Sequence, residues 1–70
     1  MTGIISRVIS GRGYAFVRDE DGWDRFVPAQ AFLGEFARLA VGLRVTFDPI
    51  GTFVPSARNN GLRAINVRLT

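Results

Sequence analysis

The chain has 70 residues, of which 47% are hydrophobic, so we expect one small domain over residues 1–70 with a single core. It contains neither cysteine nor histidine, which excludes disulfide bonds and thiol chemistry and removes the usual zinc and iron ligands and the commonest general base. The net charge is +3 and all nine basic residues are arginine, a balance that favours a polyanionic partner.

Short runs of β-branched and apolar residues, separated by turn residues, predict three strands in the first part of the chain. These strands are residues 3–9, 14–18 and 24–27, with a tight turn at 10–13 and an acidic turn at 19–22. We expect the acidic turn to be an ordinary solvated turn, because its spacing is not that of a calcium loop. Pro28 ends the third strand, since proline cannot donate to a ladder.

The second part of the chain predicts two more strands and no long helix. Residues 28–33 predict one helical turn, residues 35–40 an ordered connection, and residues 51–61 a long loop. Residues 43–50 alternate, with Leu43, Val45 and Phe47 on one side, and predict a fourth strand with one wet face; residues 62–69 predict the fifth. Because no helix is long enough to cover a flat sheet, we expect an all-β, five-stranded Greek-key barrel that is mainly antiparallel.

The second predicted strand carries two aromatic residues on one face. Side chains alternate along a strand, so Tyr14 and Phe16 share one face while Ala15 and Val17 share the other. If Val17 packs into the core, both rings face outward. Exposed rings with arginines nearby are typical of a platform on which bases of a single-stranded nucleic acid stack.

Five segments of the chain follow, in order, the motifs of a known family. Residues 12–17 match Lys-Gly-Phe-Gly-Phe-Ile, and residues 25–29 match Val-Phe-Val-His-Phe. Residues 3–9 correspond to the family's first strand, residues 41–48 to Glu-Gly-Gln-x-Val-x-Phe-Glu, and residues 61–67 to Gly-Pro-x-Ala-x-Asn-Val. Over nearly its whole length the chain thus resembles the cold-shock domain. The resemblance implies a five-stranded antiparallel Greek-key barrel of the oligonucleotide-binding type.

The resemblance also indicates which site residues are retained and which are replaced. Tyr14, Phe16 and Phe26 keep stacking groups of the family, and Phe36 occupies the position of a loop phenylalanine. The binding-face tryptophan of the family aligns with Arg7, its histidine with Pro28, and the phenylalanine after it with Ala29. Arg25 aligns with a buried valine, so we expect it either to pair with Asp24 or to lie at the barrel rim with its guanidinium in water.

The candidate nucleic-acid-binding residues divide into stacking and phosphate-binding groups. Rings are expected to stack on bases and arginines to neutralise phosphates, although each side chain has a structural alternative as packing or solvated charge. Trp23 either caps the barrel end or extends the stacking surface, and Phe53 is expected to pack in the core or at the rim. The candidates are Arg7, Arg12, Tyr14, Phe16, Phe26, Phe36 and Arg58.

These observations predict a non-catalytic module that binds single-stranded RNA or DNA, and the resemblance implies an RNA chaperone or a regulator of transcription or translation. The alternative is a protein–protein adaptor on a barrel that has lost nucleic-acid binding, since three stacking groups of the family are replaced. No apolar run approaches the ~18 residues of a membrane span, and the N-terminus lacks a signal-peptide layout. We therefore expect a cytoplasmic monomer or weak dimer without a membrane partner.

Overall fold

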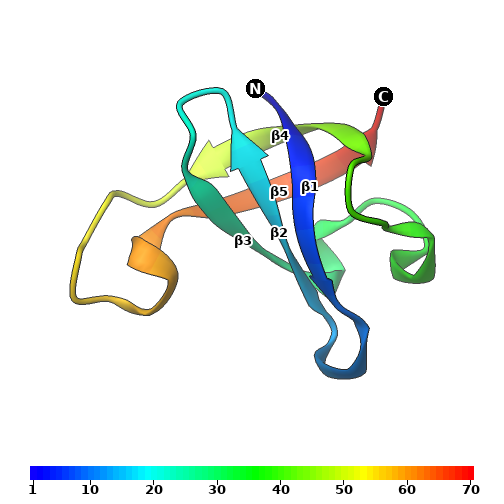
Figure 1. Cartoon of the computed structure of the whole chain (residues 1–70), viewed down its shortest axis with the longest axis horizontal. Coiled ribbons are helices and arrows are strands. Elements are labelled where there is room, and N and C mark those ends of the chain that lie inside the picture. Colours follow the sequence, from blue (N-terminus) through cyan, green and yellow to red (C-terminus); the bar gives the residue numbers. More distant parts are fainter.

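The computed structural model describes the backbone of residues 1–70 and the side chains of all of them except Arg58 and Asn59. Five strands form a closed barrel (Figure 1). The bounds predicted from the sequence are confirmed to within one residue at each end. The strands are β1 (Thr2–Ile9), β2 (Tyr14–Asp19), β3 (Asp24–Pro28), β4 (Arg44–Ile50) and β5 (Arg63–Leu69).

The order of the strands around the barrel is β1-β2-β3-β5-β4, and β4 pairs with β1 to close the ring. Three consecutive strands followed by a fourth that returns beside the first form a Greek key, which confirms the predicted fold class. One pairing differs from the expected antiparallel arrangement, because β3 and β5 run parallel where Phe26 lies opposite Arg63. A closed ring with an odd number of strands cannot alternate direction throughout, so at least one parallel pair is required.

The core lies inside the barrel and follows the predicted alternation. Ala15, Val17 and Val27 are fully buried, and Val45 and Phe47 of β4 are buried opposite them. Their neighbours on β2 and β4 face outward and are at least partly exposed. The backbones of β1 and β2 approach each other closely at Gly3. A Cβ atom on Gly3 would lie 2.6 Å from the Arg18 carbonyl oxygen. Only glycine fits there, and the absence of a side chain allows β1 and β2 to pack tightly.

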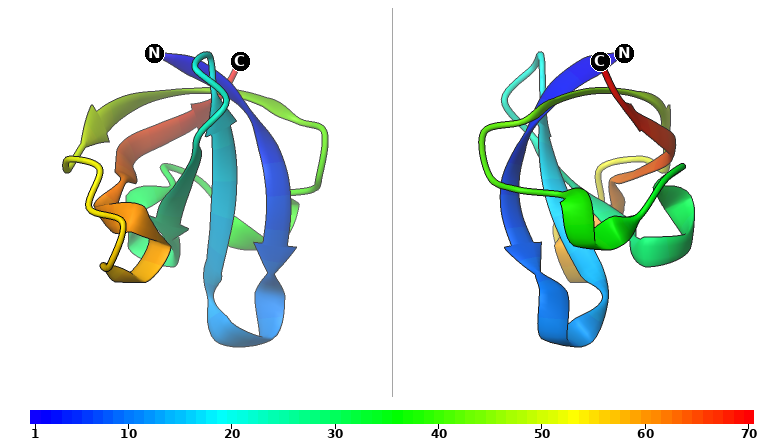
Figure 2. Two further views of the ribbon diagram at one scale, coloured as in Figure 1. Left: turned by 60° about the vertical axis from the view of Figure 1, so that its left-hand side comes forward. Right: turned by 90° about the vertical axis from the view of Figure 1, so that its right-hand side faces the viewer.

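The connection between β3 and β4 covers one end of the barrel (Figure 2). It contains two short 3₁₀ turns, Ala29–Ala31 and Phe36–Arg38, the first of which falls within the predicted helical turn. Phe32 and Leu39 from this connection are buried in the core, and Phe32 forms an isolated parallel bridge with Val67. The connection therefore completes the core in place of a longer helix.

The two termini and the β4–β5 loop lie at the periphery of the barrel. The two termini lie at the same end of the molecule, and the β4–β5 loop stands out from the barrel wall (Figures 1 and 2). This loop ends in a 3₁₀ turn, Arg58–Gly61. Throughout the described backbone, no helix is long and apolar enough to cross a membrane.

Candidate nucleic-acid interface

A β-bulge in β1 brings Arg7 onto the outer face of the barrel. Ile5 lies opposite Val17 while Arg7 lies opposite the preceding residue of β2, Phe16, so Ser6 is the extra residue. Strict alternation from the buried Ile5 would have turned Arg7 inward. The Ser6 hydroxyl lies 3.4 Å from the Phe16 carbonyl oxygen and 3.2 Å from Asp24 Oδ1. These contacts place the bulge beside the aromatic residues of β2.

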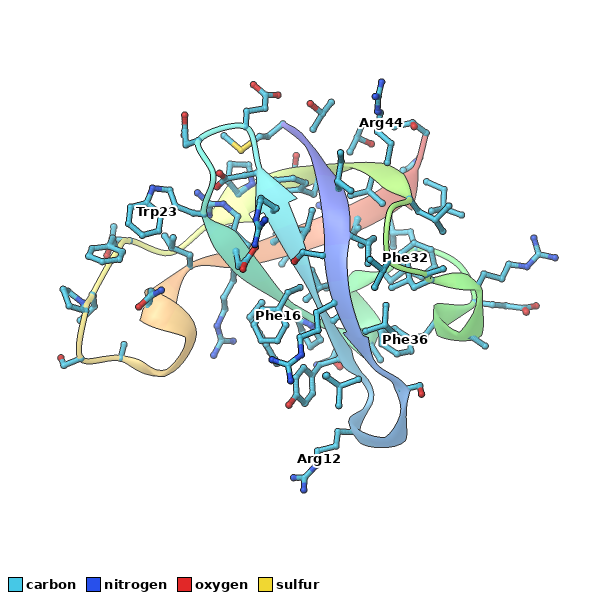
Figure 3. All side chains as sticks on the ribbon, viewed as in Figure 1. Arg12, Phe16, Trp23, Phe32, Phe36 and Arg44 are labelled. Carbon is cyan, nitrogen blue, oxygen red and sulfur yellow. The ribbon has the colours of Figure 1, made fainter. Side chains whose placement is uncertain are left out.

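Three partly exposed rings gather on the outer face of β2 and β3, and we call this cluster the aromatic platform: Tyr14, Phe16 and Phe26. Its ring centroids are 5.3–6.0 Å apart in every pair, and the rings are inclined by 42–87° to one another. The inward packing of Val17 turns the β2 rings outward, as predicted. Figure 3 shows the Phe16 ring beside the β2 and β3 strands. Such a cluster offers both ring faces and ring edges to a ligand.

Arginines flank the platform in a row that crosses four strands. Arg7 on β1 lies opposite Phe16, Phe16 lies opposite Phe26 on β3, and Phe26 lies opposite Arg63 on β5. The Arg63 guanidinium carbon is 5.6 Å from the centroid of the Phe26 ring, within the range of a cation–π contact. The sequence-based candidates omitted Arg63, because the parallel β3–β5 register that brings it to the platform leaves no local sequence signal.

Several of these arginines have charges available for a ligand. Among the described side chains, the ion pairs are Arg18–Asp24, Arg25–Asp19 and Arg38–Glu35. Arg7, Arg12 and Arg63 belong to none of them. Arg12 extends from the tip of the β1–β2 hairpin (Figure 3), where Gly13 ends the turn with a φ of 71°. Among the described side chains, Arg7 and Arg63 thus border the platform as cations outside any ion pair, and Arg12 stands two residues before Tyr14 on the hairpin that leads to it.

Two predicted site residues do not join this arrangement. Phe36 is partly buried and packs against the core, on the other side of β1 from Phe16 in Figure 3. Its contacts are accounted for by packing, so it is not part of the platform. The side chain of Arg58 lies outside the described residues. Pro28, opposite Tyr14, contributes an apolar ring beside the platform.

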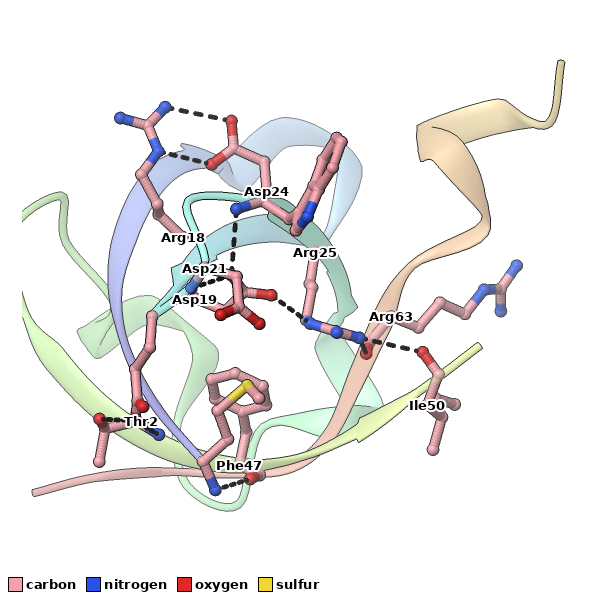
Figure 4. A network of polar contacts seen from close by, with 12 residues as sticks. Thr2, Arg18, Asp19, Asp21, Asp24, Arg25, Phe47, Ile50 and Arg63 are labelled. Carbon is pink, nitrogen blue, oxygen red and sulfur yellow. Dashed lines mark hydrogen bonds and ion pairs between the residues drawn. The ribbon is translucent and has the colours of Figure 1, made fainter. Parts of the chain in front are cut away.

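An ion pair is buried where the end of β2 meets the start of β3, and it corrects two expectations. Arg25 pairs with Asp19, with 2.7 Å between Nε and Oδ2, rather than with Asp24 or with water. The side chains are 10% and 0% exposed, so Asp19 is not part of a solvated turn. Asp24 instead pairs with the exposed Arg18 (Figure 4). The alternation of side chains along the strands explains which residues pair, because residues 19 and 25 face inward while 18 and 24 face outward.

The carboxylate of Asp19 is held in its charged form by several donors. Burial opposes ionisation and is the largest single influence on its pKa. Donation from Arg25, from the backbone N–H groups of Trp23 and Asp21, and the charge of Arg25 together outweigh it, so the pKa of Asp19 lies below its ordinary value of 3.8. A carboxylate that accepts three hydrogen bonds and has no exposed side-chain surface serves the structure of the barrel rather than a ligand.

The described side chains contain no group of three or more His, Cys, Asp or Glu residues that could hold a metal ion. Comparison with known proteins adds no relative, since no family model matches the chain and no curated protein matches it. The candidate interface therefore rests on its own geometry: an outward-facing aromatic platform on a closed barrel, flanked by arginines that form no ion pair among the described side chains.

Proposed function

We propose that this chain is a non-catalytic module that binds single-stranded RNA or DNA on the outer face of β1, β2 and β3. The observation that carries the proposal is the row Arg7–Phe16–Phe26–Arg63, with the Tyr14 ring beside it. Aromatic rings stack on any base, and arginines neutralise phosphates and stack through their planar guanidinium groups. Together these groups match the two features of a single strand, its phosphate charges and its flat bases.

The resemblance to the cold-shock domain supports this assignment, and membership of that family is part of the proposal. The platform occupies the strands on which the family's motifs fall, and Arg7 stands beside it where the family has a tryptophan. A role as an RNA chaperone or as a regulator of transcription or translation follows from the resemblance alone. A cytoplasmic location and a monomeric or weakly dimeric state complete the proposal.

Salt dependence tests the electrostatic part of the proposal. If Arg7, Arg12 and Arg63 each neutralise one phosphate, the logarithm of the association constant falls against the logarithm of salt concentration with a slope of about −2, at about −0.7 per contact. Arg12→Gln should reduce this slope by about 0.7. The measurement is fluorescence anisotropy of a labelled oligothymidine or oligouridine over a range of salt concentrations.

Arg44 provides the matched control for Arg12. It is an exposed arginine outside the ion pairs of the described residues, and it lies at the opposite end of the molecule from Arg12 in Figure 3. Arg44→Gln changes the net charge equally but should leave the slope nearly unchanged. An affinity independent of salt, or equal slopes for the two variants, would contradict phosphate binding beside the platform.

The adaptor alternative has one structural feature in its favour. Ile4 and Val41 are 46% and 66% exposed and line a shallow, mainly apolar depression beside β1, which none of the three platform rings lines. If no oligonucleotide binds at any salt concentration, this depression becomes the better candidate for a binding surface, with a protein as its ligand.

A further inference from the structure

A second pair of aromatic rings is exposed at the end of the barrel that holds the buried ion pair. Trp23 precedes β3 and Phe53 lies in the β4–β5 loop, and their ring centroids are 4.6 Å apart. The two residues remain 43% and 46% exposed despite this contact. Phe53 is therefore not in the core, and Trp23 leaves much of its surface open to solvent. Large rings held together at the surface are an unusual use of apolar area unless a ligand covers them.

The backbone on both sides of the pair is fixed by hydrogen bonds. The Trp23 N–H donates to Asp19 Oδ1 at 3.0 Å, and the Asp19 N–H donates to the Trp23 carbonyl at 2.9 Å. In the β4–β5 loop, the Val54 N–H donates to the Asn60 carbonyl at 2.9 Å, which closes the loop next to Phe53. The pair is thus positioned before any ligand arrives, which lowers the entropy lost on binding.

Three features link the Trp23–Phe53 pair to the aromatic platform: β3, the hydrogen bonds of Arg25 and a depression on the surface. Trp23 is three residues from Phe26, about 10 Å along a strand. Arg25 donates to the carbonyls of Ile50, where β4 ends, and of Arg63, whose guanidinium lies over the Phe26 ring (Figure 4). A shallow depression also joins Asn60, at the close of the Phe53 loop, to platform residue Phe16 and to Arg7.

We propose that Trp23 and Phe53 form a second base-stacking site for the same single strand that lies on the platform, with Arg63 binding a phosphate between the two sites. The inference rests on the proposed function and extends it to a longer binding site. A short oligonucleotide occupies the platform alone, and a longer one also reaches the Trp23–Phe53 pair. Oligonucleotide-binding barrels accommodate ~4–16 nucleotides, so a second stacking site is compatible with the size of the fold.

The composition of the chain allows each stacking site to be observed separately. Trp23 is the only tryptophan and Tyr14 the only tyrosine. Oligothymidine of about nine nucleotides should quench Trp23 emission, while a trinucleotide should leave it nearly unchanged. In Trp23→Ala, where no tryptophan emission masks it, the emission of Tyr14 reports trinucleotide binding at the platform, and the trinucleotide affinity should equal that of the parent.

Affinity in matched variants provides the second readout. Phe53→Ala should weaken binding of the longer oligothymidine about five- to 150-fold, as loss of one stacking contact predicts, and change trinucleotide affinity less than about two-fold. Val54→Ala is the control, because Val54 is the adjacent exposed apolar residue (41%) but has no ring. It should leave both affinities within about two-fold. Thermal unfolding of each variant checks that the barrel is intact.

The outcomes distinguish failure of this inference from failure of the proposed function. If the longer oligonucleotide binds without changing Trp23 emission, or if Phe53→Ala weakens both oligonucleotides equally, the pair is a cap on the barrel end and the inference is wrong. If neither oligonucleotide binds, the proposed function fails and the second site fails with it. Quenching of Trp23 by the longer oligonucleotide alone, together with selective loss in Phe53→Ala, supports the inference.

Discussion

Replacing Arg25 with methionine is expected to lower the free energy of unfolding by about 3–5 kcal/mol, because it leaves a buried carboxylate without its partner. The Arg25 guanidinium satisfies Asp19 and also donates to the carbonyls of Ile50 and Arg63, at 3.2 and 3.1 Å. The β3–β5 seam is otherwise short, with a bond from the Phe26 N–H to the Leu62 carbonyl. Arg25 therefore closes the barrel where the ladder is weakest, and urea unfolding followed by circular dichroism measures its contribution.

The same two strands provide an exposed control pair. Arg18 and Asp24 interact at 3.0 Å between Nε and Oδ1, but their side chains are 60% and 45% exposed. Exposed pairs contribute little to stability because water screens the charges in both states. Arg18→Met should therefore shift the unfolding midpoint far less than Arg25→Met. Equal shifts would show that burial and the three acceptors of Arg25 do not determine its contribution.

The buried pair also determines how stability responds to acid. The pKa of Asp19 is lowered by folding, so its stabilising contribution is complete above its ordinary value of 3.8 and is lost as pH falls through the lower folded pKa. Below about pH 4 the parent should lose stability more steeply than Asp19→Asn, which has no carboxylate to protonate at this position. Parallel pH profiles for the two proteins would contradict this role of Asp19.

The second large effect is expected at the aromatic platform. Phe16→Ala should weaken binding of single strands by about 1–3 kcal/mol, because one base loses its stacking partner. Phe16 lies at the centre of the row, between Arg7 and Phe26, so its loss also interrupts the surface between the two arginines. The loss should be similar for oligonucleotides of different sequence, since a ring stacks on every base. Anisotropy titrations with oligothymidine and oligoadenine measure it.

Two further variants separate stacking from folding. Phe16→Tyr keeps the ring and should retain most of the affinity. Leu33→Ala removes an exposed apolar side chain in the β3–β4 connection, beside a depression that no platform residue lines, and should bind as the parent does. If Phe16→Ala binds as tightly as the parent, or if Leu33→Ala loses as much affinity, the platform is not the binding surface.

Local alternation in the sequence was sufficient to predict most of the fold. The inward set on β4, Val45 and Phe47, and the outward rings of β2 follow from a period of two, and both are confirmed. The parallel β3–β5 pair was not predicted, because it depends on how the ring closes rather than on any local pattern. Arg63 was omitted from the site for the same reason.

Two local features also escaped the sequence-based predictions. The extra residue Ser6 reverses the alternation in β1, and the outward position of Arg7 was inferred from the family resemblance rather than from the pattern. Asp24 was the predicted partner of Arg25 because it is its neighbour in sequence. The true partner, Asp19, lies across the hairpin on the inner face. Adjacent residues of a strand point to opposite faces, so sequence proximity was misleading there.

The most direct test of single-strand binding at the platform is a chemical-shift map of the ¹⁵N- and ¹³C-labelled protein titrated with a short oligothymidine. We predict the largest changes at the rings of Tyr14, Phe16 and Phe26 and at the side chains of Arg7 and Arg63. Changes should be small at Val41 and Arg44, which line the depression beside β1. An absence of changes on addition of the oligonucleotide, or changes centred on Val41 and Arg44, would contradict the proposed interface.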